Sequence, residues 1–223
     1  MGRAMAIRNI LQEELNQIRH EILTMASKVG EDLGKALTAL KNDDRDLAKE
    51  VKADDAIVNA MQLRIEDHAA ILIATQQPVA ADLRELVTIL KITGDLERIG
   101  DHAVHLAKAA LKLSRDPPFR SMEHLEKMAE TGQEMLRSCI SAYMAKDTEA
   151  ARKTAAMDGI IDAEHKLLTE ETLKLMKDQP KLVKKAVRLL KVSGYLERLG
   201  DHITNICEGI IYMVHAKHEE LND

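Results

Sequence analysis

The chain has 223 residues, of which 45% are hydrophobic and 31% are charged, and its formal net charge is -5. This balance is typical of a soluble globular protein and excludes a disordered chain. The mild acidity provides no broad basic surface, so we expect no nucleic-acid partner. Aromatic residues make up only 2% of the chain, and a core of Leu, Ala, Ile, Val and Met suits packed helices better than strands.

The expected location is the cytoplasm. The two cysteines, Cys139 and Cys207, lack the spacing of a zinc site or a redox motif, which favours a reducing compartment. The first residues, MGRAMAIRNILQEE, lack the apolar segment of a signal peptide. The longest uncharged run, between Asp67 and Asp82, contains Pro78 and is far shorter than the roughly 20 apolar residues of a spanning helix. We therefore expect no direct membrane insertion, so that any role at a membrane depends on a partner.

Apolar residues recur every three or four positions, which is the period of amphipathic α-helices. In the first half this pattern predicts helices over about residues 7–40, 47–72 and 79–113. Asp43 or Asp44 in KNDD is a candidate N-cap of the second helix, and Pro78 separates the second helix from the third. The segment SRDPPFR, with Pro117 and Pro118, is the strongest break in the chain and the expected domain boundary.

The second half repeats this plan, with helices expected over about residues 122–145, 147–176 and 180–218. Matching features recur at separations of 100 to 103 positions: Glu97 and Glu197, Pro78 and Pro180, Asp55 and Asp158. We interpret this as an internal duplication. The sequence therefore predicts an all-α fold of six long amphipathic helices in two tandem three-helix bundles, residues 1–116 and 117–223, placed end to end.

Two nearly identical heptads lie on the last helix of each bundle: LERIGDH at residues 96–102 and LERLGDH at residues 196–202. In each, two carboxylates four residues apart share a helix face well away from the apolar stripe, on the flank or outer surface of the bundle, and such like charges repel by roughly 0.2–0.5 kcal/mol. A glycine inside a helix costs about 1 kcal/mol relative to alanine, yet both halves keep glycines at positions 94 and 100 or 194 and 200. We expect a close helix contact or a ligand to offset these choices.

Each middle helix carries a second polar pair at the same spacing, Asp55 and Asn59 in DDAIVN and Asp158 and Asp162 in MDGIID. The middle and last helices of an antiparallel bundle are neighbours, so the pairs can face each other. Their oxygen atoms suit Mg, Ca, Mn or oxidised iron better than a closed tetrahedral zinc site. A solvated acidic face is the alternative interpretation.

These motifs resemble the PhoU family of phosphate-transport accessory proteins. The resemblance rests on LERIGDHA, LERLGDHITNI, QPVAADLR and the acidic pairs, and it extends over the whole chain, including IRHEILTMASKVGEDLGKAL and DLAKEV. Members of this family are cytoplasmic proteins of two three-helix bundles that associate with the phosphate ABC transporter and a sensor histidine kinase. The resemblance implies a homodimeric adaptor, not an enzyme, that negatively regulates phosphate uptake and phosphate-starvation signalling, with the transporter ATPase and the kinase as partners.

The resemblance also implies metal sites, because some members bind multinuclear iron or zinc clusters through paired E(D)xxxD motifs. Carried over by position, the ligands of the two sites are Glu97, Asp101, Asp55 and Asn59 in the first bundle and Glu197, Asp201, Asp158 and Asp162 in the second. Mg or Mn is the alternative metal. Because Asn59 replaces a carboxylate, we expect weaker binding in the first bundle, where His105 is a candidate nitrogen ligand. Arg98 and Arg198 are expected to neutralise neighbouring acidic charge.

Three other functions remain open. The chain can serve a secondary phosphate transporter, act as a carboxylate-bridged metalloenzyme, or form a structural helical oligomer with solvated acidic faces. Against an enzyme, neither ERIGDH nor ERLGDH has the Glu-x-x-His spacing of di-iron bundles, and no nucleophile with an adjacent base is evident.

Overall fold

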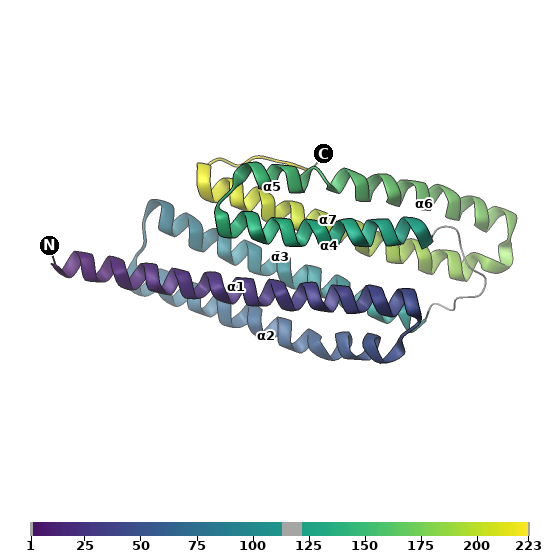
Figure 1. Cartoon of the computed structure of the whole chain (residues 1–223), viewed down its shortest axis with the longest axis horizontal. Helices are drawn as coiled ribbons and strands as arrows, with labels where there is room; N and C mark the ends of the chain where they lie inside the picture. The colour runs from purple at the N-terminus through teal and green to yellow at the C-terminus, as the bar shows by residue number, and fades with distance from the viewer. Residues whose placement is uncertain (1, 113–121, 223) are drawn as a thin grey trace.

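The structure is a computed structural model that describes residues 2–112 and 122–222. These stretches form seven α-helices and one 3₁₀ turn (Figure 1): α1 (Gly2–Asn42), α2 (Arg45–Gln76), α3 (Ala80–Ala110), α4 (Met122–Ala145), α5 (Thr148–Ala155), α6 (Asp158–Asp178), η1 (Pro180–Leu182) and α7 (Val183–His215). The described stretches contain no strand, which confirms the all-α prediction. None of their helices is long and apolar enough to cross a bilayer. The expected boundary between residues 116 and 117 lies outside the described residues.

An aspartate caps the second helix of each bundle. Asp44 accepts hydrogen bonds from two backbone N–H groups in the first turn of α2, at 3.0 and 3.1 Å, which confirms it as the N-cap. Asp147 does the same for α5. The residue before each cap has the left-handed conformation, with φ 55° at Asp43 after α1 and φ 54° at Lys146 after α4. A left-handed residue is a common end of a helix. The duplication is therefore visible in the backbone of both corners.

The single helix expected over residues 147–176 is interrupted, which corrects the prediction. α5 ends at Ala155 and α6 begins at Asp158. The backbone N–H of Met157 bonds to the Thr154 carbonyl, three residues back, at 3.1 Å, so a tighter turn replaces the α-helical hydrogen bonds between the two helices. Gly159 adds the low helix propensity of glycine. As a result Asp158 becomes the first residue of α6, where only 6% of it is exposed.

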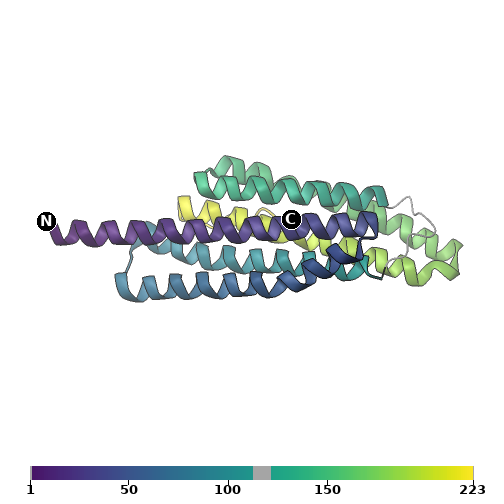
Figure 2. The same cartoon turned by 60° about the horizontal axis from the view of Figure 1, so that its bottom comes forward.

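The two three-helix bundles consist of α1, α2 and α3, and of α4, the α5–α6 pair and α7. They lie alongside each other, because α3 packs against α7 and α1 packs against α4 (Figures 1 and 2). The expected end-to-end placement is therefore wrong. The reason lies in α3 and α7, which bury residues on more than one face. Each of them contributes both to its own bundle and to the contact between bundles.

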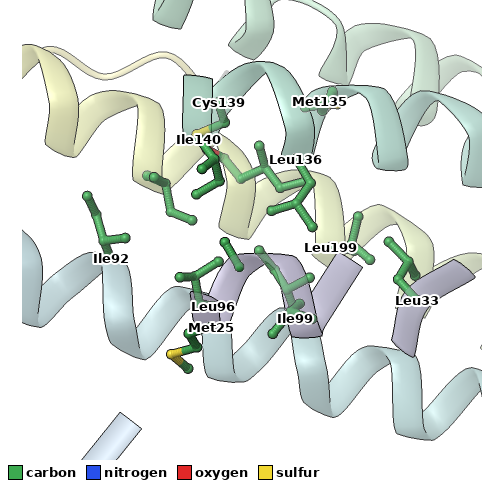
Figure 3. Close-up of a cluster of buried hydrophobic side chains, with 14 of the residues drawn as sticks. Met25, Leu33, Ile92, Leu96, Ile99, Met135, Leu136, Cys139, Ile140 and Leu199 are labelled. Atoms are coloured by element: carbon green, nitrogen blue, oxygen red, sulfur yellow. The ribbon is translucent and has the colours of Figure 1, made fainter. Parts of the chain in front are cut away.

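One continuous hydrophobic core joins the bundles. Figure 3 shows Met25, Leu96 and Ile99 of the first bundle in one cluster with Leu136 and Ile140 of the second, and all five are buried. Burial of this apolar surface stabilises the bundles as one unit. The shared core also fixes α3 and α7, which carry the two heptads.

Candidate metal centres

The two heptads occupy equivalent positions on α3 and α7. Leu96 and Leu196, the first residue of each, are buried in the core. The glutamate and aspartate of each heptad are half-buried at the flank of the helix. The carboxylates therefore lie at the flank of each bundle and outside the core, as expected, but they are half-buried and so lie closer to the apolar stripe than predicted.

Close helix packing explains the glycine within each heptad. A Cβ on Gly100 would lie 3.2 Å from Val58 Cγ1 of α2, and a Cβ on Gly200 would lie 2.0 Å from Asp158 Oδ1 of α6. The first contact is tight, and the second is impossible unless the aspartate moves. The other repeated glycine, at positions 94 and 194, would have no atom within 4 Å of its Cβ. The expected close approach is therefore found at one glycine of each half.

The first acidic group brings Asp55 of α2 near Glu97 and Asp101 of α3, and Asn59 lies four residues after Asp55 on α2; all four residues are half-buried. Burial raises the pKa of Glu97, and the charges of Asp101 and Asp55 raise it further, whereas Arg98 opposes this rise. Arg98 Nη1 donates to Asp101 Oδ2 at 3.1 Å, and Arg98 Nε lies 3.4 Å from Glu97 Oε2. The structure thus makes the three carboxylates electrostatic neighbours, and one arginine neutralises part of their charge.

The second acidic group has four carboxylates. Burial of Asp158, together with the charges of Asp162, Asp201 and Glu197, raises the pKa of Asp158 to about 7. Thr204 opposes this rise by donating a 3.4 Å hydrogen bond to Asp158 Oδ2. Asp158 Oδ1 is buried and has no hydrogen-bond partner within residues 2–112 and 122–222. Since buried polar atoms in proteins nearly always have a partner, this oxygen is a candidate ligand for a cation.

The other carboxylates of the second group also repel one another. Burial raises the pKa values of Glu197 and Asp201, and the charge of Asp162 raises both further. Arg198 lowers these two pKa values, but among the described residues it forms no ion pair of the kind that Arg98 makes. The expected neutralising role is therefore confirmed as an ion pair for Arg98 and as a longer-range effect for Arg198.

A hard cation would suit the second group better than the first. It would provide a partner for Asp158 Oδ1 and would offset the repulsion among four carboxylates. As they stand, the described residues contain no group of three or more His, Cys, Asp or Glu side chains arranged to hold a metal ion. Binding would therefore have to draw the more exposed carboxylates, such as Asp162, toward the buried one.

The histidines of the heptads lie at the contact between the bundles. The rings of His102 and His202 are 5.6 Å apart between centroids, and His202 Nδ1 lies 2.9 Å from Asp95 Oδ1. His105, the candidate nitrogen ligand of the first group, stacks on Tyr195 of α7 with centroids 4.7 Å apart. The positions of these rings are therefore explained by the packing of α3 against α7.

Thr204 is a site residue that sequence analysis missed. It lies on α7, three residues after Asp201, and its hydroxyl is the only hydrogen-bond donor to the Asp158 carboxylate among the described residues. The signal in the sequence is the difference between the halves, because Val104 occupies the corresponding position of the first bundle. A polar residue at this buried position in one half alone indicates a polar neighbour.

The sequence is similar to known proteins over nearly its whole length. A family model described as the PhoU domain matches residues 22–110 and again residues 125–210. The chain is 34% identical over 217 residues to the phosphate-specific transport system accessory protein PhoU homolog of Clostridium acetobutylicum, and the match covers 97% of this chain and 99% of that protein. The homolog of Streptococcus pneumoniae is 34% identical over 216 residues, with 97% and 100% covered.

The fold is similar to two solved structures. The crystal structure of the phosphate transport system regulatory protein PhoU from Streptococcus pneumoniae has a TM-score of 0.89 at 32% identity, and the match covers 94% of this chain and 99% of that chain. The crystal structure of PhoU from Pseudomonas aeruginosa has a TM-score of 0.88 at 31% identity, with 92% and 99% covered.

Proposed function

Because the chain belongs to the PhoU family, we propose that it is a regulatory accessory protein of a phosphate transport system. In this proposal it acts in the cytoplasm as a negative regulator of phosphate uptake and of phosphate-starvation signalling. It is an adaptor, working as a homodimer, between the ATPase of a phosphate ABC transporter and a sensor histidine kinase. The observation that carries the proposal is the match, over nearly the whole chain, to proteins named for this transport system.

We further propose that the two acidic groups bind metal within this adaptor. Two observations support this assignment: the mutual repulsion of the carboxylates, and the buried Asp158 Oδ1, for which the described part of the chain offers no hydrogen-bond partner. A multinuclear iron or zinc cluster is the expected occupant, with Mg or Mn as the alternative. Because the groups lie at helix flanks and outside the core, a bound metal would shape the surface offered to a partner.

The regulatory role is tested in cells that lack this chain and carry a phosphate-starvation reporter. The parent chain should repress the reporter in phosphate-rich medium. The variant Glu97→Gln, Asp101→Asn, Glu197→Gln, Asp201→Asn should fail to repress it while keeping its helical circular dichroism and losing its metal. If the parent chain does not repress the reporter, the regulatory role is wrong. If the variant represses it fully, only the role of the carboxylates is wrong.

The same assay separates the two kinds of transporter. Deletion of the ABC transporter should abolish the effect of the parent chain on the reporter. If deletion of a secondary phosphate transporter abolishes it instead, the chain serves that transporter. Copurification with the ATPase and the kinase, each tested singly, then identifies the direct partner.

A further inference from the structure

Cys139 of α4 and Cys207 of α7 are in contact inside the second bundle. Both side chains are fully buried, and their Sγ atoms are 3.5 Å apart. Figure 3 shows Cys139 among the side chains of the shared core. The two residues lie 68 positions apart in the sequence, so their spacing along the chain does not indicate the contact. The packing of α4 on α7 brings them together.

The pair is organised as a hydrogen-bonded dithiol. The Cys207 thiol donates to Cys139 Sγ, and the Cys139 thiol donates to the carbonyl of Ile203 at 3.8 Å. The hydrogen bond from Cys207 raises the pKa of the Cys139 thiol well above its usual value, and burial and the charge of Asp95 raise it further. Because the thiolate is the reactive form of cysteine, the pair is stable in its reduced state and reacts slowly.

Little movement separates this dithiol from a disulfide. The S–S bond is about 2.05 Å long, so the sulfurs of Cys139 and Cys207 must approach each other by about 1.5 Å. Loss of the thiol hydrogens leaves no buried group unsatisfied, because the Ile203 carbonyl still accepts the backbone N–H four residues later in α7. The bond therefore leaves the hydrogen bonding of α7 intact.

We propose that Cys139 and Cys207 form an intramolecular disulfide between α4 and α7 on reaction with a small peroxide. One sulfur attacks the O–O bond to give a sulfenic acid, and the released hydroxide takes up the thiol proton as water. The second sulfur then attacks the sulfenic sulfur, forms the S–S bond and releases a second water. In total, two thiols lose two electrons and two protons, and one hydrogen peroxide becomes two water molecules.

The bond would constrain the helix that carries the second heptad. α7 contains Glu197 and Asp201 and packs against α3 as well as α4. A covalent link at Cys207 would fix α7 to α4 close to the contact between the bundles. A dithiol reductant would reverse the link, which makes this a reversible modification of the second bundle.

The test is oxidation of the reduced, folded full-length chain with hydrogen peroxide. After catalase treatment, the chain is unfolded with iodoacetamide present and its mass is measured without reductant. The expected product takes up no carbamidomethyl group and yields a tryptic peptide pair that joins Cys139 to Cys207. Its Tm should rise by on the order of 10 °C, because the bond closes a long loop in the unfolded chain. Dithiothreitol should reverse both changes.

The single variants Cys139→Ala and Cys207→Ala are the matched controls. Each should remain alkylated at its one thiol and should show no rise in Tm with peroxide. The unfolded parent chain serves as the positive control for the oxidant. The proposal is overturned if the folded parent stays doubly alkylated under conditions that oxidise the unfolded chain. A disulfide between two chains, or sulfinic acid without the cross-link, overturns it equally.

Discussion

Gly200 of α7 faces the carboxylate of Asp158 on α6 so closely that a Cβ on the glycine would lie 2.0 Å from Asp158 Oδ1. In the first bundle the equivalent glycine, Gly100, faces a methyl group of Val58. The same glycine of the repeated heptad therefore makes an apolar contact in one bundle and an acidic contact in the other. This difference places a buried carboxylate against the last helix of the second bundle alone.

Replacement of Gly200 by alanine should displace Asp158. The strain of the added methyl group should make Gly200→Ala less stable than Gly194→Ala by roughly 1–3 kcal/mol. Gly194→Ala is the matched control on the same helix, since its Cβ meets open space and alanine favours a helix by about 1 kcal/mol. Urea unfolding measures both variants. Equal stability of the two would show that Asp158 does not depend on the glycine.

The stability of the metal-free protein should fall as the pH rises from about 4 to 7, because of Asp158. Its pKa of about 7 in the folded state exceeds the ordinary value of 3.8, so from about pH 4 to 7 the folded state holds a proton that the unfolded state has lost. The stabilisation is complete below this window and is lost above it. Asp158→Asn should therefore be more stable than the parent at about pH 8, by roughly 2–4 kcal/mol, and similar to it near pH 4.

Urea unfolding with a chelator present, over about pH 4 to 9, measures this difference. The control is Asp162→Asn, which removes an exposed carboxylate. At high pH it should restore less of the lost stability than Asp158→Asn does. If the curves of the parent and Asp158→Asn run parallel over the whole range, Asp158 has no raised pKa in the folded protein.

The helices could be predicted from the sequence because their signals are local. The three-to-four period of apolar residues, the Asp44 cap and the stop before Pro78 each depend on residues within one or two turns. The heptads could also be recognised from the sequence, because both place a glycine and two like charges four residues apart inside a helix, where each is unfavourable. Their glycine at position 100 or 200 is itself a signal of close helix packing, and it does contact the middle helix in each bundle.

The rest depends on how helices pack, which their own periodicity does not encode. The side-by-side arrangement requires second buried faces on α3 and α7, and on α3 this face adds residues of mixed character, such as Thr88, His102 and Ala107, to an already apolar stretch. The break before Asp158 is a single tight turn, closed by the Met157 N–H and the Thr154 carbonyl, and no proline or glycine precedes it in α5. The contact of Cys139 with Cys207 depends on the relative rotation of α4 and α7, so the sequence carries no signal for it.

His102 should destabilise the fold on acidification. Burial, followed by the charges of His202, His105 and Arg198, lowers the pKa of His102 to about 4 from 6.5. As the pH falls from 6.5 to about 4, His102 is protonated in the unfolded state before it is protonated in the folded state. The folded state is therefore most stable, relative to the unfolded state, above pH 6.5, and it loses stability as the pH falls toward about 4. The slope of this effect is opposite to that of Asp158, and the two partly cancel in the parent protein.

His102→Phe separates the two effects, because it keeps a ring against Tyr195 and removes a buried Nδ1 that has no hydrogen-bond partner among the residues the structure describes. The variant should gain stability relative to the parent as the pH is lowered from about 7 to 5, measured by urea unfolding. His20→Phe, at an exposed histidine, is the control and should follow the parent. A constant difference between His102→Phe and the parent over this range would contradict the lowered pKa.

The second acidic group should bind divalent metal more tightly than the first. Its four carboxylates contrast with three in the first group, where Asn59 replaces a fourth and Arg98 pairs with Asp101. Ligand charge is a main determinant of affinity for hard cations. We therefore expect Asp162→Asn to weaken binding at the second group by about tenfold, and Arg98→Gln to strengthen binding at the first group by a similar factor.

Each group is measured alone by calorimetry with Mn²⁺, in a background that disables the other group. Glu197→Gln with Asp201→Asn leaves the first group, and Glu97→Gln with Asp101→Asn leaves the second. In the first background, Asn59→Asp should raise the affinity toward that of the second group, because it restores the missing carboxylate. Equal dissociation constants for the two groups, unchanged by Asn59→Asp and by Asp162→Asn, would show that formal charge does not distinguish them.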